Sequence, residues 1–251
     1  RRPLARNPTF NSLRLLHFTS GGLTEARIRE LTEAPWLNEI QELEIVGWGF
    51  DPTAFQILCD AGPFPNLWRL NVNGTIHSPN VLDLLCDTDA FPQLTSLSVA
   101  RINLGSESTQ RFANHVPFDL RELNLWYCRI GTEGAQSLAS SKRMSSLRSL
   151  ILGTNRIDAE GAKAIADSEH LRELRHLNLS YNPFGKEGLL ALGESAKWPK
   201  LRELHFALLG REKAQHQEET SESFIRSLNA PKLRTLKIPG MPLKKAGATA
   251  L

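Results

Sequence analysis

His176, Glu203 and His205 are the residues of this sequence best suited to bind a metal ion, because they combine two imidazoles with a carboxylate. His176 and Glu203 are 27 residues apart, and one residue separates Glu203 from His205. A zinc site requires three or four converging ligands. The third ligand here is only a carboxylate, and we expect the surface to be open to water. The sequence therefore predicts an exposed polar cluster at these positions and no metal site.

The sequence contains no motif of a catalytic or nucleotide-binding site. GxGxxG, the P-loop, HExxH, paired CxxC and GxSxG are all absent. Cys59, Cys86 and Cys128 are too few for a disulfide framework, and we expect them to be buried thiols. Buried free thiols favour a reducing compartment, so the predicted location is the cytoplasm. We expect no enzymatic activity, no catalytic residue and no cofactor.

A group of aromatic and polar residues forms the strongest candidate for binding a protein partner. Interfaces are often anchored by aromatic residues together with arginine, and Trp126 is followed directly by Tyr127. The predicted partner-binding residues are Arg101, Asn124, Trp126, Tyr127, Thr154 and Tyr181. The alternative is that Trp126 only packs over its small neighbours Ala100 and Gly153.

Arginine recurs in the second half of the chain, at Arg121, Arg148, Arg175, Arg202 and Arg234. Such a series could form a basic surface, but we expect Glu122, Glu173 and Glu203 to lie close enough to offset it. The net charge of the 251 residues is only +3, which is too small to indicate nucleic acid or a membrane as a partner. The predicted partner is therefore a protein, or another domain of the same chain.

These candidate residues are positioned by an internal repeat. Large apolar residues recur 27 residues apart, or 53 apart where one repeat is shorter, at Phe10, Leu37, Phe64, Phe91, Met144, Leu171 and Trp198. A fixed period of this length is typical of solenoid proteins. Residues 1–251 are therefore predicted to form one elongated domain whose units contact only their neighbours.

Three residues after each of these positions a short motif begins that is apolar at its first, fourth, sixth and eleventh positions. About nine copies start at Leu13, Ile40, Leu67, Leu94, Leu120, Leu147, Leu174, Leu201 and Leu233. Alternation between the fourth and sixth positions predicts a strand. Apolar residues at helical spacing follow, such as Ile28 and Leu31, which predicts a helix in the second half of each unit.

The boundaries of the helices are also encoded. Thr24, Asp51, Ser78 and Asp158 share one repeat position and are good N-cap residues, and Pro52 and Pro79 follow two of them. Gly134, Gly161, Gly188 and Gly247 share another position, where we expect the first helical turn to pack tightly on its neighbour.

The motif resembles the leucine-rich repeat, LxxLxLxx(N/C)xL, and the repeat length with a full helix resembles its ribonuclease-inhibitor-like subfamily. Cys128, Asn155 and Asn182 occupy the ninth position, whose side chain bonds free backbone groups of the turn in that family. Gly21, Trp48, Thr75, Ile102, Leu209 and Met241 depart from it. The resemblance implies an α/β solenoid, a horseshoe segment with a concave parallel sheet and convex helices.

The resemblance and the predicted open sheet favour a non-enzymatic scaffold that binds a protein through the concave sheet and adjoining loops. The alternatives are a structural or autoinhibitory spacer of a larger signalling protein and, by analogy with the family, a regulator of a GTPase or a nuclease. Neither end resembles a capping unit, so we expect a segment of a longer chain. The charged insertion at residues 211–222 is expected to be a solvated loop.

Overall fold

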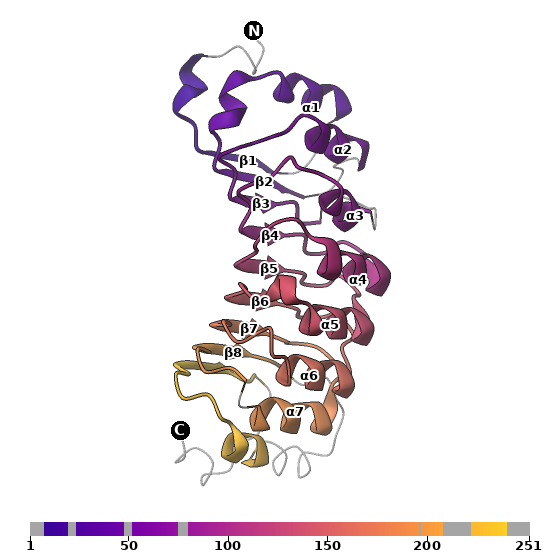
Figure 1. Cartoon of the computed structure of the whole chain (residues 1–251), viewed down its shortest axis with the longest axis vertical. Coiled ribbons are helices and arrows are strands. Elements are labelled where there is room, and N and C mark those ends of the chain that lie inside the picture. Colours follow the sequence, from indigo (N-terminus) through magenta and orange to yellow (C-terminus); the bar gives the residue numbers. More distant parts are fainter. Residues whose placement is uncertain are drawn as a thin grey trace.

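A computed structural model of the chain describes residues 8–19, 24–47, 52–74, 80–195, 197–207 and 222–239. It forms an elongated stack in which a parallel sheet lies along one side and helices along the other (Figure 1). The fold is the predicted α/β solenoid, with the sheet on the concave face.

Within the described residues the sheet has nine strands, and each strand pairs in parallel with the next one in the sequence, from β1 to β9. The strands are β1 (Leu15–Thr19), β2 (Glu42–Val46), β3 (Arg69–Asn71), β4 (Ser96–Ser98), β5 (Glu122–Asn124), β6 (Ser149–Ile151), β7 (His176–Asn178), β8 (Glu203–His205) and β9 (Thr235–Lys237). Their register follows the repeat, so that Leu43 pairs with Leu70, 27 residues later. The shortened repeat keeps this register, because Leu97 pairs with Leu123.

Helices cover the opposite side of the stack. The α-helices are α1 (Glu25–Thr32), α2 (Pro52–Asp60), α3 (Val81–Cys86), α4 (Gly105–His115), α5 (Gly131–Ser140), α6 (Ala159–Ala166) and α7 (Gly185–Glu194), with residues 222–227 also helical. The described residues also include the 3₁₀ helices η2 (Pro8–Ser12), η3 (Pro35–Glu39) and η4 (Lys142–Met144). Each α-helix from α1 to α7 contacts the next, as nearest-neighbour stacking requires.

One continuous apolar core lies between the sheet and the helices. The fourth-position leucines from Leu43 to Leu204 are at most 2% exposed. The recurring large residues that revealed the repeat are also buried, from Leu37 to Trp198, whereas Phe10 at the first unit is half-buried. Removing this apolar area from water is the main force that holds the units together.

The helix-start predictions are confirmed where the structure describes them. The Thr24 hydroxyl accepts from the Arg27 N–H, and the Asp158 carboxylate accepts from the Gly161 N–H at 3.1 Å. A Cβ added to Gly188 would lie 3.1 Å from Ala162 Cβ and 3.2 Å from Ala159 Cα in the preceding repeat, which confirms tight packing of the first turn on its neighbour. Asp51, Ser78, Pro79 and Gly247 lie outside the described residues.

The turns after the strands are joined by the side chains of the ninth position. Asn155 Oδ1 accepts from the Cys128 N–H at 2.8 Å, and Asn182 Oδ1 accepts from the Asn155 N–H at the same distance. Asn155 Nδ2 donates to the Leu125 carbonyl at 2.6 Å, and Asn182 Nδ2 donates to the Leu152 carbonyl at 2.9 Å. Each asparagine thus pairs backbone groups of two repeats, as the resemblance implied.

At Ile102, which departs from the motif, the turn uses backbone groups instead. The Leu104 and Gly105 N–H groups donate to the Cys128 carbonyl at 3.1 and 3.3 Å. The other departures, Gly21, Trp48, Thr75, Leu209 and Met241, lie outside the described residues, as do residues 211–221 of the insertion.

Candidate protein-binding surface

A row of four residues follows strands β4 to β7, at the same position of successive repeats. Arg101, Tyr127, Thr154 and Tyr181 all have left-handed backbone conformations, with φ of 63°, 58°, 60° and 60°. Gly74 has the same conformation, with φ of 63°, one repeat earlier. Left-handed backbone costs a non-glycine residue roughly 1–2 kcal/mol, and a β-branched residue such as threonine is unusual there. The fold therefore requires this conformation, but it does not select these four side chains.

Backbone hydrogen bonds hold the row in place. The Arg101 N–H donates to the Trp126 carbonyl at 2.7 Å, and the Tyr127 N–H donates to the Gly153 carbonyl at 2.9 Å. The Thr154 N–H continues the series by donating to Ser180 at 2.8 Å. These bonds extend the strand ladder into the turns, so the side chains of the row are carried on a rigid backbone.

The two tyrosines of this row are the exposed large hydrophobic residues among the described residues of their repeats. Tyr127 is 51% exposed and Tyr181 is 46% exposed, and among the described residues only Leu15 is another large hydrophobic residue in this class. Tyrosine combines a large apolar area with a polar hydroxyl at little conformational cost, so it suits a binding surface.

Trp126 packs against Tyr181, one of the two tyrosines. Its ring meets Tyr181 edge to face, with centroids 6.0 Å apart. It also lies directly over Gly153, because a Cβ added there would fall 2.0 Å from Trp126 Cζ3. The alternative packing role of Trp126 is therefore confirmed for Gly153. Contact with Ala100 stays a prediction.

Asn124, the remaining predicted residue, has a structural task of its own. Its Oδ1 accepts from the Trp126 N–H at 3.0 Å and fixes the end of β5. Asn178 makes the equivalent bond to the Ser180 N–H, also at 3.0 Å. The structure thus brings five of the six predicted residues into one patch and gives Asn124 a positioning role beside it.

The five recurring arginines lie side by side at the other edge of the sheet. The N–H groups of Arg148, Arg175, Arg202 and Arg234 each donate, at 2.8 Å, to the carbonyl of the preceding arginine. None of the five guanidinium groups forms an ion pair or a side-chain hydrogen bond with another described residue. We call this series the arginine ladder: Arg121, Arg148, Arg175, Arg202 and Arg234.

The glutamates that were expected to neutralise the ladder have other partners. Glu122 accepts from Arg69 at 3.3 Å and from the Ser96 hydroxyl at 2.8 Å. Glu173 pairs with Lys200 at 2.5 Å, and the nearest basic group to Glu203 is His205, at 3.8 Å. None of the three carboxylates pairs directly with a guanidinium group of the ladder among the described residues, and Glu203 lies nearest to His205 on its own strand.

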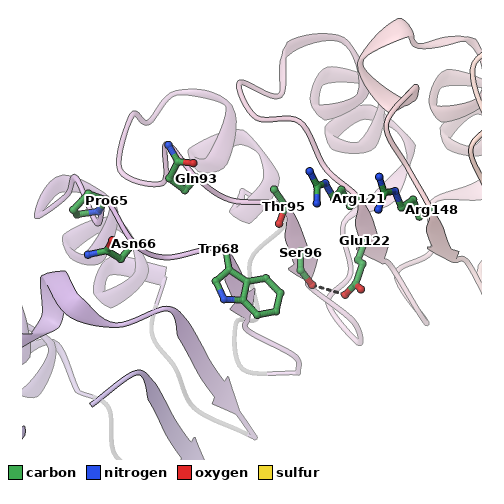
Figure 2. A pocket seen from close by; sticks show the side chains of 9 residues that line it. All are labelled: Pro65, Asn66, Trp68, Gln93, Thr95, Ser96, Arg121, Glu122 and Arg148. Carbon is green, nitrogen blue, oxygen red and sulfur yellow. Dashed lines mark hydrogen bonds between the residues drawn. The ribbon is translucent and has the colours of Figure 1, made fainter. Parts of the chain in front are cut away.

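Glu173 still interacts with the ladder at longer range. The Lys200 hydrogen bond first, and then the nearby charges of Arg148 and Arg175, lower the pKa of Glu173. Part of the ladder also borders an open pocket of about 680 Å³. Figure 2 shows Trp68 and Glu122 lining this pocket together with Arg121 and Arg148.

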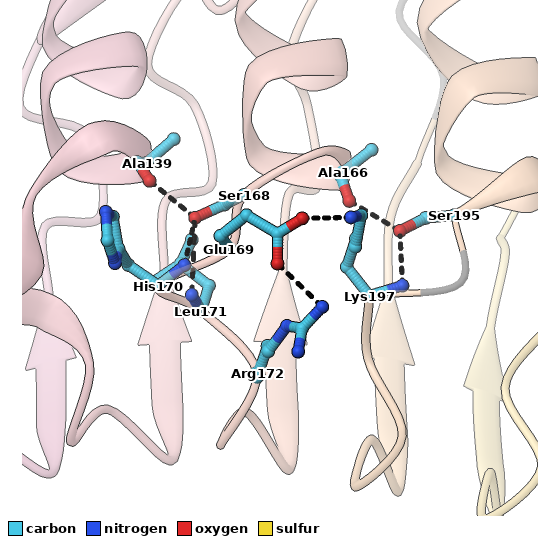
Figure 3. A network of polar contacts seen from close by, with 9 residues as sticks. All are labelled: Ala139, Ala166, Ser168, Glu169, His170, Leu171, Arg172, Ser195 and Lys197. Atoms are coloured by element: carbon cyan, nitrogen blue, oxygen red, sulfur yellow. Dashed lines mark hydrogen bonds and ion pairs between the residues drawn. The ribbon is translucent and has the colours of Figure 1, made fainter.

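A serine shortly after each of the helices α5, α6 and α7 forms a hydrogen bond with the helix of the preceding repeat. This serine position was not predicted from the sequence. Ser168 Oγ donates to the Ala139 carbonyl and Ser195 Oγ donates to the Ala166 carbonyl, both at 2.5 Å (Figure 3). Ser141 Oγ donates to the Ala113 carbonyl in the same way. The three serines are 27 residues apart, so the repeat would have revealed them. Lys197 and Glu169 form an ion pair beside them.

The cysteines have no place at this surface. Burial raises the pKa of Cys59 and of Cys128 to about 12, and that of Cys86 to about 11. All three are free thiols, with Cys59 and Cys128 buried and Cys86 half-buried. A thiol with a raised pKa is a poor nucleophile.

A family model for the leucine-rich repeat matches residues 117–139, 143–166 and 170–193. These three segments are leucine-rich repeats. They cover the most regular part of the solenoid, which carries Tyr127, Thr154 and Tyr181 between strands and helices.

Other comparisons concern the fold. The chain is similar to a chain from the crystal structure of the Rad7 and Elc1 complex in yeast, with a TM-score of 0.59 and 16% identity. The similarity covers 94% of this chain and 55% of that chain, and at this identity it shows the fold alone. No curated protein matches the sequence. In the part of the chain that the structure describes, no helix is long and apolar enough to cross a membrane.

Proposed function

We propose that this solenoid is a non-enzymatic scaffold that binds a protein partner through the row formed by Arg101, Tyr127, Thr154 and Tyr181. The observation that carries the proposal is the residue choice in this row. Left-handed backbone favours glycine, and Gly74 occupies the position one repeat earlier. Strained residues with exposed aromatic side chains tend to occur where function retains them.

The arginine ladder adds an electrostatic preference for acidic groups on the partner. Tyr127 follows Arg121 by six positions in the sequence, which is at most about 20 Å at 3.3 Å per residue. A standard interface buries about 800 Å² on each partner, which is wide enough to cover both edges of the sheet. We infer that a partner seated on the sheet contacts both the row and the ladder, and that its affinity falls with salt.

The broader interpretation places the protein in the cytoplasm as a ribonuclease-inhibitor-like array of about nine repeats. The buried free thiols support a reducing compartment. The helix in each unit from α1 to α7 supports the subfamily. The alternative, an autoinhibitory spacer, uses the same surface against another domain of a longer chain.

A quantitative pull-down with variants of the row tests the proposal. Asparagine accepts left-handed backbone, so the double variant Tyr127→Asn, Tyr181→Asn removes the rings and keeps the fold. Arg129 and Arg156 are exposed and also left-handed, with φ of 56° and 61°, but lie at another repeat position. Their double asparagine variant is therefore a matched control.

The expected result is a loss of at least tenfold in partner recovery for the tyrosine variant, with the control unchanged. Far-UV circular dichroism verifies the fold of both. Equal recovery with wild type and with the tyrosine variant would refute the proposed row. If the surface instead binds a separately expressed domain of the same protein, and the tyrosine variant abolishes that binding, the result would favour the autoinhibitory alternative.

A further inference from the structure

The side chains of His176, Glu203 and His205 converge on the sheet face at the C-terminal part of the array. His176 on β7 pairs in register with Glu203 on β8, and His205 lies two residues further along β8, on the same face. One ligand atom from each residue lies within 4.8 Å of the other two. The imidazole rings meet edge to face, with centroids 5.0 Å apart.

Both histidines carry a ring nitrogen that lacks a hydrogen-bond partner. His176 Nε2 and His205 Nε2 are shielded from solvent and form no hydrogen bond with the residues that the structure describes. The nearest acidic atom to His205 Nε2 is Glu203 Oε2, at 3.8 Å, which is too long for a hydrogen bond. Shielded polar atoms are normally hydrogen-bonded, so two orphaned nitrogens in one cluster require an explanation.

The other nitrogen of His176 has a defined partner. His176 Nδ1 lies 3.1 Å from Ser149 Oγ on the neighbouring strand β6. When Nδ1 donates its proton to this hydroxyl, Nε2 keeps a free lone pair that can bind a metal ion. Histidines that bind metal ions are typically oriented by such a hydrogen bond from the second nitrogen.

We propose that His176, His205 and Glu203 form a binding site for a divalent transition-metal ion of the Zn²⁺ class. Two imidazole nitrogens and one carboxylate are a known ligand set for zinc, with water in the fourth position. Ligands about 2.0–2.2 Å from a tetrahedral ion are about 3.3 Å from one another. The present separations of up to 4.8 Å therefore close by side-chain rotation, without movement of the strands.

The surroundings of the cluster set its affinity. Lys237 on β9 pairs in register with His205 and brings a positive charge next to the site. Glu122 on β5 contributes a negative charge at longer range, because its field also reaches His176. The lysine opposes a bound cation, so its removal is expected to strengthen metal binding.

The sequence did not predict this site, because the sheet face at these positions was expected to be open to water. Glu203 is exposed as expected, but the His205 side chain is only 14% exposed and His176 is half-buried. Burial of both rings removes water as a competing partner of the nitrogens. The site is independent of the proposed tyrosine row, which lies at the turns beyond the strands.

Isothermal titration of the full chain with Zn²⁺, after removal of metal with a chelator, tests the proposal. One ion per chain is expected for wild type. His176→Gln and His205→Gln keep side-chain size, and each is expected to weaken binding at least tenfold. Lys237→Ala is expected to tighten it about threefold, the order expected for one charge screened by water.

The matched control uses a second histidine–carboxylate pair on the sheet. His17 Nδ1 lies 3.7 Å from Glu44 Oε2 without a second histidine, so His17→Gln should leave the affinity unchanged. Co²⁺ adds a spectroscopic readout, because visible d–d absorption reports tetrahedral ligation. Absence of saturable Zn²⁺ binding to wild type would overturn the proposal. Unchanged affinity in the doubly substituted, folded His176→Gln, His205→Gln chain would overturn it equally.

Discussion

Replacement of Asn155 by alanine should be among the most destabilising single changes on the turn side of the sheet. Asn155 is fully buried and makes two short hydrogen bonds, from the Cys128 N–H at 2.8 Å and to the Leu125 carbonyl at 2.6 Å. Alanine leaves both backbone groups without a partner. An unpaired buried group costs about 1–3 kcal/mol, so the expected loss is about 2–6 kcal/mol.

The measurement is urea unfolding followed by far-UV circular dichroism, with the free energy of unfolding compared at equal slope. The matched control is Asn124→Ala, on the strand just before the same turn. Asn124 is half-buried, and its side chain makes one hydrogen bond, from the Trp126 N–H. In the alanine variant, water can reach this N–H and replace the lost amide oxygen. Its expected cost is therefore about 0.5–1.5 kcal/mol.

A third variant separates the two bonds. Asn155→Asp retains an acceptor for the Cys128 N–H but places a negative charge against the Leu125 carbonyl. It should be at least as destabilising as alanine at neutral pH, because burying an unpaired charge is costly. Equal and small losses for Asn155→Ala and Asn124→Ala, below about 1 kcal/mol, would show that water enters the turn, and would refute the reasoning.

Three further substitutions test other parts of the fold. Ser168→Ala removes a buried bond between helices and should cost about 1–3 kcal/mol in urea unfolding; a cost near zero would show that the bond is dispensable. Asp158→Ala should cost about 1 kcal/mol at neutral pH, an amount typical of a solvent-screened N-cap. A hydrogen bond with Thr132 and, to a smaller extent, one from the Gly161 N–H lower the pKa of Asp158. The stabilisation that the Asp158 carboxylate provides is therefore present above the unfolded pKa and is lost as pH falls through the folded pKa. A cost of Asp158→Ala that does not change with pH would contradict this. Gly153→Val should displace the Trp126 ring, changing tryptophan fluorescence and costing about 1–3 kcal/mol, whereas an unchanged spectrum would show that the ring is held elsewhere.

The sequence predicted most of the fold because each repeat buries its apolar residues against its immediate neighbours. The position of Leu43 in its unit predicts that it faces the core, and the 27-residue period predicts that it lies beside Leu70. Asn155 and Asn182 could likewise be assigned to the turns, since their partners are backbone groups at a fixed offset. The serines at 141, 168 and 195 obey the same rule and were open to the same prediction.

Contacts between side chains on the surface could be predicted less well from the repeat. Trp126 could be placed on the sheet, but its contact with Tyr181 depends on ring orientations that neighbouring repeats set together. Arg69 and Glu122 are 53 residues apart and meet across an intervening strand, so the period of 27 gave no sign of their pairing. Choice among such charged partners depends on rotamers, which no spacing specifies.

What the sequence determined by itself is therefore the scaffold: a strand, a turn and a helix in each unit, stacked in order in one parallel sheet. This follows from burial, which depends on residue type and period alone. The tertiary structure decided which polar groups meet. It left the guanidinium groups of the arginine ladder without an ion pair to any other residue that the structure describes, and it brought the nitrogens of His176 and His205 together while shielding them from water. Those outcomes depend on directional contacts among side chains of several repeats, and only the folded arrangement fixes them.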